Sequence, residues 1–352
     1  MTTEADALAS DVTEPAPETE PDGRSLKKRL LLVGVAALAL AAIGIGYTVW
    51  AGARPSDSAY ASGDAAPVSD PGLYLHDQGG YVVLQDGGGK VSVDDGSKTP
   101  PRTGTGVDCL RFYAAGENAV CVRPQGGLKP MTTVEILDTE LAVKETFKFE
   151  GVPSRARVSP SGKMIAWTLF VTGDSYAGTN FSTRTGLYDV DSNYLVDSIE
   201  EIQLYIDGKR VRRPDVNYWG ITFAADDNTF YATVATDGKT YLVKGDYENW
   251  TATTVRENVE CPSLSPDETR LVFKKRVNEG VEDPWRLYVL DLETMQEKPL
   301  AEDRNVDDQA AWLDDDTVAY MIDGDVWSVP ADGSGEPKLI APDATSPVMV
   351  GG

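Results

Sequence analysis

Histidine is the scarcest residue of catalytic use in this chain, because His76 is the only one among 352 residues. A serine hydrolase needs a base beside its nucleophile, normally a histidine, and its serine commonly stands in a Gly-x-Ser-x-Gly motif, which the sequence lacks. His76 lies in an N-terminal run beside the expected stalk, where a structural or exposed histidine is favoured over a catalytic one. A single histidine and three dispersed cysteines cannot build a zinc site. We therefore expect no hydrolase triad, no metal site and no cofactor.

Basic residues are also scarce, with 32 lysines and arginines against 56 aspartates and glutamates, a net charge of -24. Nucleic acids and anionic membrane surfaces are negatively charged, so this balance disfavours both as partners. Solubility of a secreted domain explains the acidity more simply than an acidic binding site does.

Charge is missing altogether from Leu30–Trp50, a stretch of 21 residues rich in Leu, Ala, Val and Ile. A helix of this length spans about 31 Å, which matches the hydrocarbon core of a bilayer. A basic cluster within residues 24–29 precedes the stretch, and the positive-inside rule places that side in the cytoplasm. We expect a single-pass membrane protein with its N-terminus inside the cell.

The flanking segments complete this organisation. Residues 1–29 are acidic, end in the basic cluster and are expected to be a disordered cytoplasmic tail. Residues 51–71 are rich in Ala, Ser, Gly, Asp and Pro, a composition typical of a flexible stalk. Residues 72–352 would then form an extracytoplasmic domain. The alternative is a cleaved signal peptide, because Ala51-Gly52-Ala53 suits signal peptidase, and the domain would be secreted.

Two series of repeats run through residues 72–352. Apolar runs that alternate in the manner of strands, such as Val134-Glu-Ile-Leu-Asp and Leu287-Tyr-Val-Leu-Asp, recur every 39 to 54 residues and number six with the run at Val91. Between them lie strand–turn–strand units, of which Val158-Ser-Pro-Ser-Gly-Lys-Met-Ile-Ala-Trp is a clear copy. Four short strands per period of 40–50 residues are typical of a propeller blade. We expect an all-β propeller of six blades, with six outer strands marked by the first series.

One repeat carries a family resemblance. Cys261-Pro-Ser-Leu-Ser-Pro-Asp-Glu-Thr-Arg-Leu-Val-Phe, followed by Arg286-Leu-Tyr-Val-Leu-Asp, resembles the repeat of TolB-type propellers. TolB carries an α/β domain before its propeller, whereas this chain has the expected membrane segment and stalk there. The resemblance implies the fold and a tendency to contact proteins, but not the partners of TolB. Closing the first blade would need a strand from Leu73–Leu75 or from Val348–Val350.

The cysteines suggest one bridge. Cys109 and Cys121 flank the turn at residues 114–118, on two strands that should pair as a hairpin, and an extracytoplasmic location permits oxidation. We expect a disulfide between them and a buried thiol at Cys261. The acidic runs Asp314–Asp316 and Asp323–Asp325 offer oxygen ligands for calcium but fall at turn positions, where aspartate is favoured.

Two segments are candidate partner surfaces. Residues 171–186 form an insertion rich in Tyr, Phe, Asn, Ser and Gly, and residues 207–213 are the only basic cluster in the acidic domain. The candidate surface residues are Tyr176, Asn180, Phe181, Arg210, Arg212, Arg213, Tyr218 and Trp219.

Two functional classes remain after these exclusions. The first is a non-catalytic propeller that binds a protein or a cell-envelope component outside the membrane. The second is a glycosidase or lyase that uses paired carboxylates at the propeller channel on envelope polysaccharide. The absence of recognisable catalytic motifs favours the first class.

Overall fold

The computed structural model describes residues 72–77, 81–85, 102–171, 182–278 and 283–351, all within one compact unit, Ala59–Gly352. The expected tail, membrane segment and stalk therefore lie outside the described residues. Within those residues no helix has the length and apolar character needed to span a bilayer.

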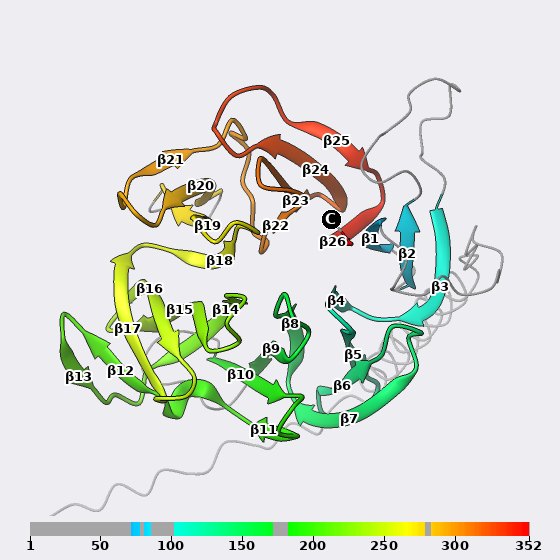
Figure 1. Ribbon diagram of the computed structural model, residues 1–352, viewed down its shortest axis with the longest axis horizontal. Coiled ribbons are helices and arrows are strands. Elements are labelled where there is room, and N and C mark those ends of the chain that lie inside the picture. The colour runs from blue at the N-terminus through cyan, green and yellow to red at the C-terminus, as the bar shows by residue number, and fades with distance from the viewer. Residues whose placement is uncertain (1–71, 78–80, 86–101, 172–181, 279–282, 352) are drawn as a thin grey trace, which may run out of the picture. The chain divides into compact units, whose positions relative to one another are not determined.

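The strands form six sheets, ordered around a centre as the blades of a propeller (Figure 1). From the inside outward, blade 1 contains β26 (Ala344–Val350), β1 (Gly72–Asp77), β2 (Tyr81–Gln85) and β3 (Arg102–Asp108). Blade 2 contains β4 (Arg111–Ala115), β5 (Asn118–Gln125), β6 (Met131–Leu137) and β7 (Val143–Glu150). Blade 3 contains β8 (Val152–Val158), β9 (Met164–Val171), β10 (Ser182–Asp189) and β11 (Tyr194–Val196).

The other three blades continue the ring. Blade 4 contains β14 (Asn217–Phe223), β15 (Thr229–Thr236), β16 (Lys239–Asp246) and β17 (Thr251–Glu257), to which β12 (Gln203–Ile206) and β13 (Lys209–Val211) add at the outer edge. Blade 5 contains β18 (Glu260–Leu264), β19 (Arg270–Arg276), β20 (Trp285–Asp291) and β21 (Glu297–Pro299). Blade 6 contains β22 (Ala311–Trp312), β23 (Thr317–Ile322), β24 (Asp325–Pro330) and β25 (Lys338–Ala341). A 3-10 turn, η2 (Ile199–Glu201), precedes β12.

This architecture confirms the prediction of an all-β, six-bladed propeller. The ring is closed by pairing between the two ends of the domain, since β26 lies antiparallel to β1 with Tyr74 opposite Val348. Blade 1 therefore takes a strand from each of the two segments, Leu73–Leu75 and Val348–Val350, that were alternatives from the sequence.

The first repeat series marks a different strand from the one expected. Its copies at Val134, Leu187, Tyr241, Leu287 and Val326 fall on β6, β10, β16, β20 and β24, the third strand of each blade. The outermost strands are short or exposed, as the three residues of β11 and β21 show, so they carry little apolar pattern. The third strand packs between neighbours on both sides and therefore keeps a readable apolar alternation. The copy at Val91 lies outside the described residues.

Packing between blades forms the core. Trp167 of β9 is 1% exposed and packs against Phe147 and Phe149 of blade 2, with ring centroids 6.0 and 5.5 Å away. Gly186, on the adjacent strand β10, lies opposite Trp167. A Cβ atom at Gly186 would lie 2.6 Å from the indole ring, so this position needs glycine for close approach.

A disulfide joins Cys109 to Cys121, with 5.4 Å between their Cα atoms. Cys121 lies opposite Phe112 in the β4–β5 ladder, so Cys109, just before β4, reaches its partner from outside the paired register. Cys261 is a buried free thiol in β18.

Candidate functional site

The innermost strands of four blades are irregular. Register shifts interrupt the pairing of β8, β14, β18 and β26 with their neighbours. Three residues in these strands adopt left-handed backbone conformations, Gly220 (φ 64°), Cys261 (φ 49°) and Ser346 (φ 50°). Bulges of this kind turn side chains out of the regular alternation and are common beside functional sites. The channel of the propeller is therefore lined by side chains whose direction the bulges set.

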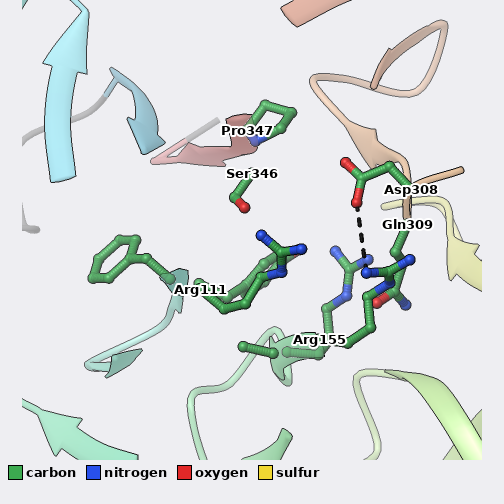
Figure 2. Close-up of a pocket in the computed structure, with 10 residues that line it drawn as sticks. Arg111, Arg155, Asp308, Gln309, Ser346 and Pro347 are labelled. Carbon is green, nitrogen blue, oxygen red and sulfur yellow. Dashed lines mark ion pairs between the residues drawn. The ribbon is translucent and has the colours of Figure 1, made fainter. Parts of the chain in front are cut away.

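Three arginines line a cavity at this channel, and Figure 2 labels two of them, Arg111 and Arg155. Arg111 comes from β4, and Arg155 and Arg157 come from one face of β8. Arg111 Nε and Arg155 Nη1 both donate to the carbonyl of Ser154, over 2.6 and 2.9 Å. These shared backbone contacts hold two guanidinium groups side by side in fixed positions.

The third arginine is held from two sides. Arg157 is 5% exposed, donates from Nη2 to the carbonyl of Ala310 over 3.2 Å, and lies 4.4 Å above the ring of Tyr113. The Nε atoms of Arg155 and Arg157 are buried and have no hydrogen-bond partner. The site therefore keeps donors that nothing in the described residues satisfies, and a buried donor without a partner is costly.

The cavity is lined by fewer acidic than basic side chains. Of its ten lining residues, only Asp308 is acidic, and its carboxylate lies 4.0 Å from Arg155. The cavity has a volume of about 30 Å³. A single water needs about 10–15 Å³ on the same measure, so the space suits a carboxylate but not a sugar ring.

The pKa values of Arg111 and Arg155 shift in opposite directions. Burial lowers the pKa of Arg111, Asp308 opposes this effect, and the neighbouring Arg155 adds to it. Burial alone would lower the pKa of Arg155, but the Cys261 sulfur and the carboxylates of Asp308 and Asp307 raise it. Both arginines stay charged at neutral pH, because their ordinary pKa lies far above 7.

A second polar cluster lies on the adjoining side of the channel. Lys274 of β19 is 3% exposed, forms an ion pair with Asp307 and lies 4.7 Å over the ring of Trp285. Burial raises the pKa of Glu260, at the start of β18, to about 6, although Lys274 opposes the shift. Burial alone would raise the pKa of Asp307, but Lys274, together with Arg155 and Arg276, lowers it. Two neighbouring carboxyl groups therefore differ in their affinity for protons.

The predicted partner surface is only partly described. Tyr176, Asn180 and Phe181 lie outside the described residues. Arg210 and Arg212 are exposed at the β13 hairpin, separate from the residues that line the channel cavity. Arg213 is also exposed and pairs with Asp215 and Asp237, as the sequence analysis allowed.

Tyr218 corrects the expectation for that surface. Its side chain is 0% exposed in β14, within the core between blades 3 and 4, so it cannot contact a partner directly. The apolar side of an inner strand faces the neighbouring blade, which explains its burial. Trp219, the next residue, is half-buried.

Sequence reasoning did not find the arginines of the channel. Arg155 and Arg157 stand two residues apart, a spacing that puts both on one face of a strand, and this signal was present. Asp308 carries no such signal, because it lies in the connection before β22 and approaches Arg155 only through closure of the ring. No group of three or more His, Cys, Asp or Glu residues suited to a metal occurs in the described part of the chain.

Comparison with known proteins supports the fold and nothing finer. No protein family matches the sequence, and no curated protein does. The solved nidogen/laminin complex is similar with a TM-score of 0.51 and 10% identity, over 78% of this chain and 96% of that one. TolB from Acinetobacter baumannii has a TM-score of 0.48 and 14% identity, over 78% of this chain and 65% of that one. An oligogalacturonate lyase in complex with manganese has a TM-score of 0.41 and 12% identity, over 65% and 64%.

TolB-type propellers are thus among the structures that this chain resembles. The chain spans just under two thirds of the length of the Acinetobacter protein. Both non-enzymes and enzymes are among the similar structures, so the function has to be argued from the site itself.

Proposed function

We propose that this protein is a non-catalytic binding propeller whose channel receives an acidic group of a protein or cell-envelope partner. Leu30–Trp50 anchors it as a single-pass membrane protein, the N-terminal tail is cytoplasmic, and the propeller is extracytoplasmic. No nucleic acid is involved.

The surplus of arginine in the channel carries this proposal. Arg111, Arg155 and Arg157 face one cavity that contains a single carboxylate, in a chain whose net charge is -24. Burying three guanidinium groups costs free energy, and their contacts with backbone carbonyls leave some of their N–H groups without an acceptor. An incoming carboxylate would neutralise the excess positive charge of the cavity, and arginine suits this geometry because its donors form a planar fork.

The size of the cavity favours binding of a small group at the tip of a side chain or at the end of a polymer chain. A volume of about 30 Å³ admits a carboxylate and excludes a whole sugar residue. Such a pocket suits recognition of an acidic tip that a partner inserts along the propeller axis, with the surrounding loops contacting the rest of the partner.

Partner capture from intact cells tests the proposal with paired variants. Full-length chains carrying Arg111→Gln with Arg155→Gln, or Arg210→Gln with Arg212→Gln, remove the same charge from the channel and from the exposed hairpin. We expect the channel variant to lose the partner that the wild type retains, and the hairpin variant to keep it. Equal melting temperatures would show that both variants fold. Loss with the hairpin variant alone would contradict the proposal.

A second candidate is the carboxylate enzyme, which one observation favours. Glu260 has a pKa of about 6 and the nearby Asp307 has a lowered pKa, and two carboxyl groups with separated pKa values can act as acid and base. This reading predicts that Glu260→Gln abolishes cleavage of an acidic envelope polysaccharide. Absence of any cleavage by the wild type across neutral and acidic pH would remove this candidate.

A further inference from the structure

A groove lies at the outer side of the propeller, between blades 3 and 4. It is formed by β11, by the η2 turn and by the connection between β16 and β17, and its volume is about 890 Å³. This size is in the range of small-molecule sites. The residues that line it are Tyr194, Leu195, Val196, Asp197, Ser198, Glu201, Tyr247, Glu248 and Trp250.

The aromatic wall of the groove is held in place by its backbone. Trp250 has φ 52°, a left-handed conformation that bulky side chains rarely adopt. Its N–H donates to the carbonyl of Tyr247 over 3.2 Å, and its carbonyl accepts from the N–H of Gln203 over 3.1 Å. The rings of Tyr247 and Trp250 meet edge to face, 6.1 Å apart. A strained residue that presents an aromatic ring to a groove indicates a site that is organised before binding.

The charges of the groove are all negative. Asp197, Glu201 and Glu248 are exposed, and their carboxylates have no hydrogen bond or ion pair among the described residues. Another acidic residue nearby is engaged, since Asp246 at the end of β16 accepts from the N–H and the side-chain amide of Asn249, over 3.0 and 2.7 Å. No lysine or arginine lines the groove. Three carboxylates therefore face one space without a counter-charge.

From this arrangement we infer that the groove binds an organic cation, an ammonium group carried on a small apolar body. Aromatic faces attract cations, and an unpaired carboxylate beside them adds a direct charge interaction. Tyr194, 58% exposed, extends the aromatic wall to the rim. An anionic ligand would meet three like charges, so the groove differs in its ligand from the arginine channel. A free small-molecule amine and the lysine side chain of a protein share this chemistry.

Titration of the full-length protein in neutral detergent with choline, followed by tryptophan fluorescence and calorimetry, tests the inference. The uncharged isostere 3,3-dimethylbutanol has the same shape without the charge. We expect saturable binding of choline that is at least about tenfold tighter than that of the isostere, because cation–π attraction and ion pairing both need the charge. Equal binding of the two compounds, or no saturable binding of choline, would overturn the inference.

Matched variants locate the site. Asp197→Asn, Glu201→Gln and Glu248→Gln together should weaken choline binding at least about tenfold. The control Glu140→Gln, Asp303→Asn and Glu336→Gln removes the same charge from exposed residues elsewhere and should change the affinity by less than about twofold. An equal loss in both sets would assign the effect to net charge and overturn the groove as the site. Tighter binding of tri-lysine than of choline would identify a protein side chain as the source of the cation, and the reverse order a small molecule.

Discussion

The hydroxyl of Ser159, in the first turn of blade 3, donates to the carboxylate of Asp227, in the corresponding turn of blade 4, over 2.8 Å. Ser161 donates to the same oxygen over 2.6 Å. Blades 5 and 6 are joined in a similar way, because the Asp267 N–H of blade 5 donates to the Asp315 carboxylate of blade 6 over 3.1 Å. Acidic residues in these turns thus connect neighbouring blades. For Asp314–Asp316 this supports the turn interpretation over a calcium site, since Asp314 also accepts from the N–H of Asp316.

Asp227 allows a clean test of that connection. Its backbone is left-handed (φ 56°), so Asp227→Gly keeps the conformation and removes only the carboxylate. Loss of two hydrogen bonds to a charged group at a partly exposed site should lower the free energy of unfolding by about 1–3 kcal/mol. Asp227→Asn retains an acceptor and should cost less. Urea denaturation measures both, and an Asp227→Gly protein as stable as the wild type would contradict the connection.

The disulfide predicts a modest contribution to stability. Cys109 and Cys121 are 12 residues apart, so replacing both with serine should cost at most about 3 kcal/mol and leave the protein folded. Alkylation without reduction, followed by peptide mapping, should find these two cysteines joined. Modification of both thiols in the unreduced protein would refute the bridge. Cys261→Ala serves as the control and should leave the mapped bridge unchanged.

Trp167 and Gly186 should behave as one packing unit. Trp167→Ala removes a buried ring and should destabilise the protein by about 3–5 kcal/mol. Gly186→Ala forces a Cβ to within 2.6 Å of that ring and should cost about 1–3 kcal/mol. In the Trp167→Ala background the ring is gone, so the cost of Gly186→Ala should largely disappear. Additive free energies in this double-mutant cycle would show that the two residues do not interact.

His76 predicts a pH dependence of stability. Burial, and then the charge of Arg111, lower its pKa, although the Cys109 carbonyl, Asp77 and Asp108 favour the charged form. The unfolded chain therefore binds the proton more readily than the folded protein. The stabilising contribution is complete above the unfolded pKa of about 6.5 and is lost as pH falls through the folded value.

The variant His76→Gln isolates this contribution from the many carboxylates. Between about pH 7.5 and pH 5, the free energy of unfolding should decline more steeply for the wild type than for His76→Gln. Chemical denaturation at a series of pH values gives both slopes. Identical slopes would show that His76 does not titrate differently in the folded and unfolded states.

Local features of the sequence were sufficient to predict the blades but not the channel. Turns such as Ser159–Gly162 and the alternation in β20 depend on neighbouring residues, and both are readable in one dimension. The channel depends on closure of the ring, which brings Asp308 to Arg155 across 153 residues, and on bulges that no composition reveals. Tyr218 illustrates the same limit of local sequence patterns. Its aromatic ring was a candidate for a partner surface, but the fold buries it between two blades.

Direct titration of the full-length protein with a glutamate-tipped peptide tests the central claim, that the channel arginines bind an acidic group. Asp308 competes for the same guanidinium groups, so Asp308→Asn should bind the peptide more tightly than the wild type does. Arg111→Gln with Arg155→Gln should weaken binding at least about tenfold, and Arg210→Gln with Arg212→Gln should leave it within about twofold. Unchanged affinity in the channel variant, or weaker binding by Asp308→Asn, would contradict the account.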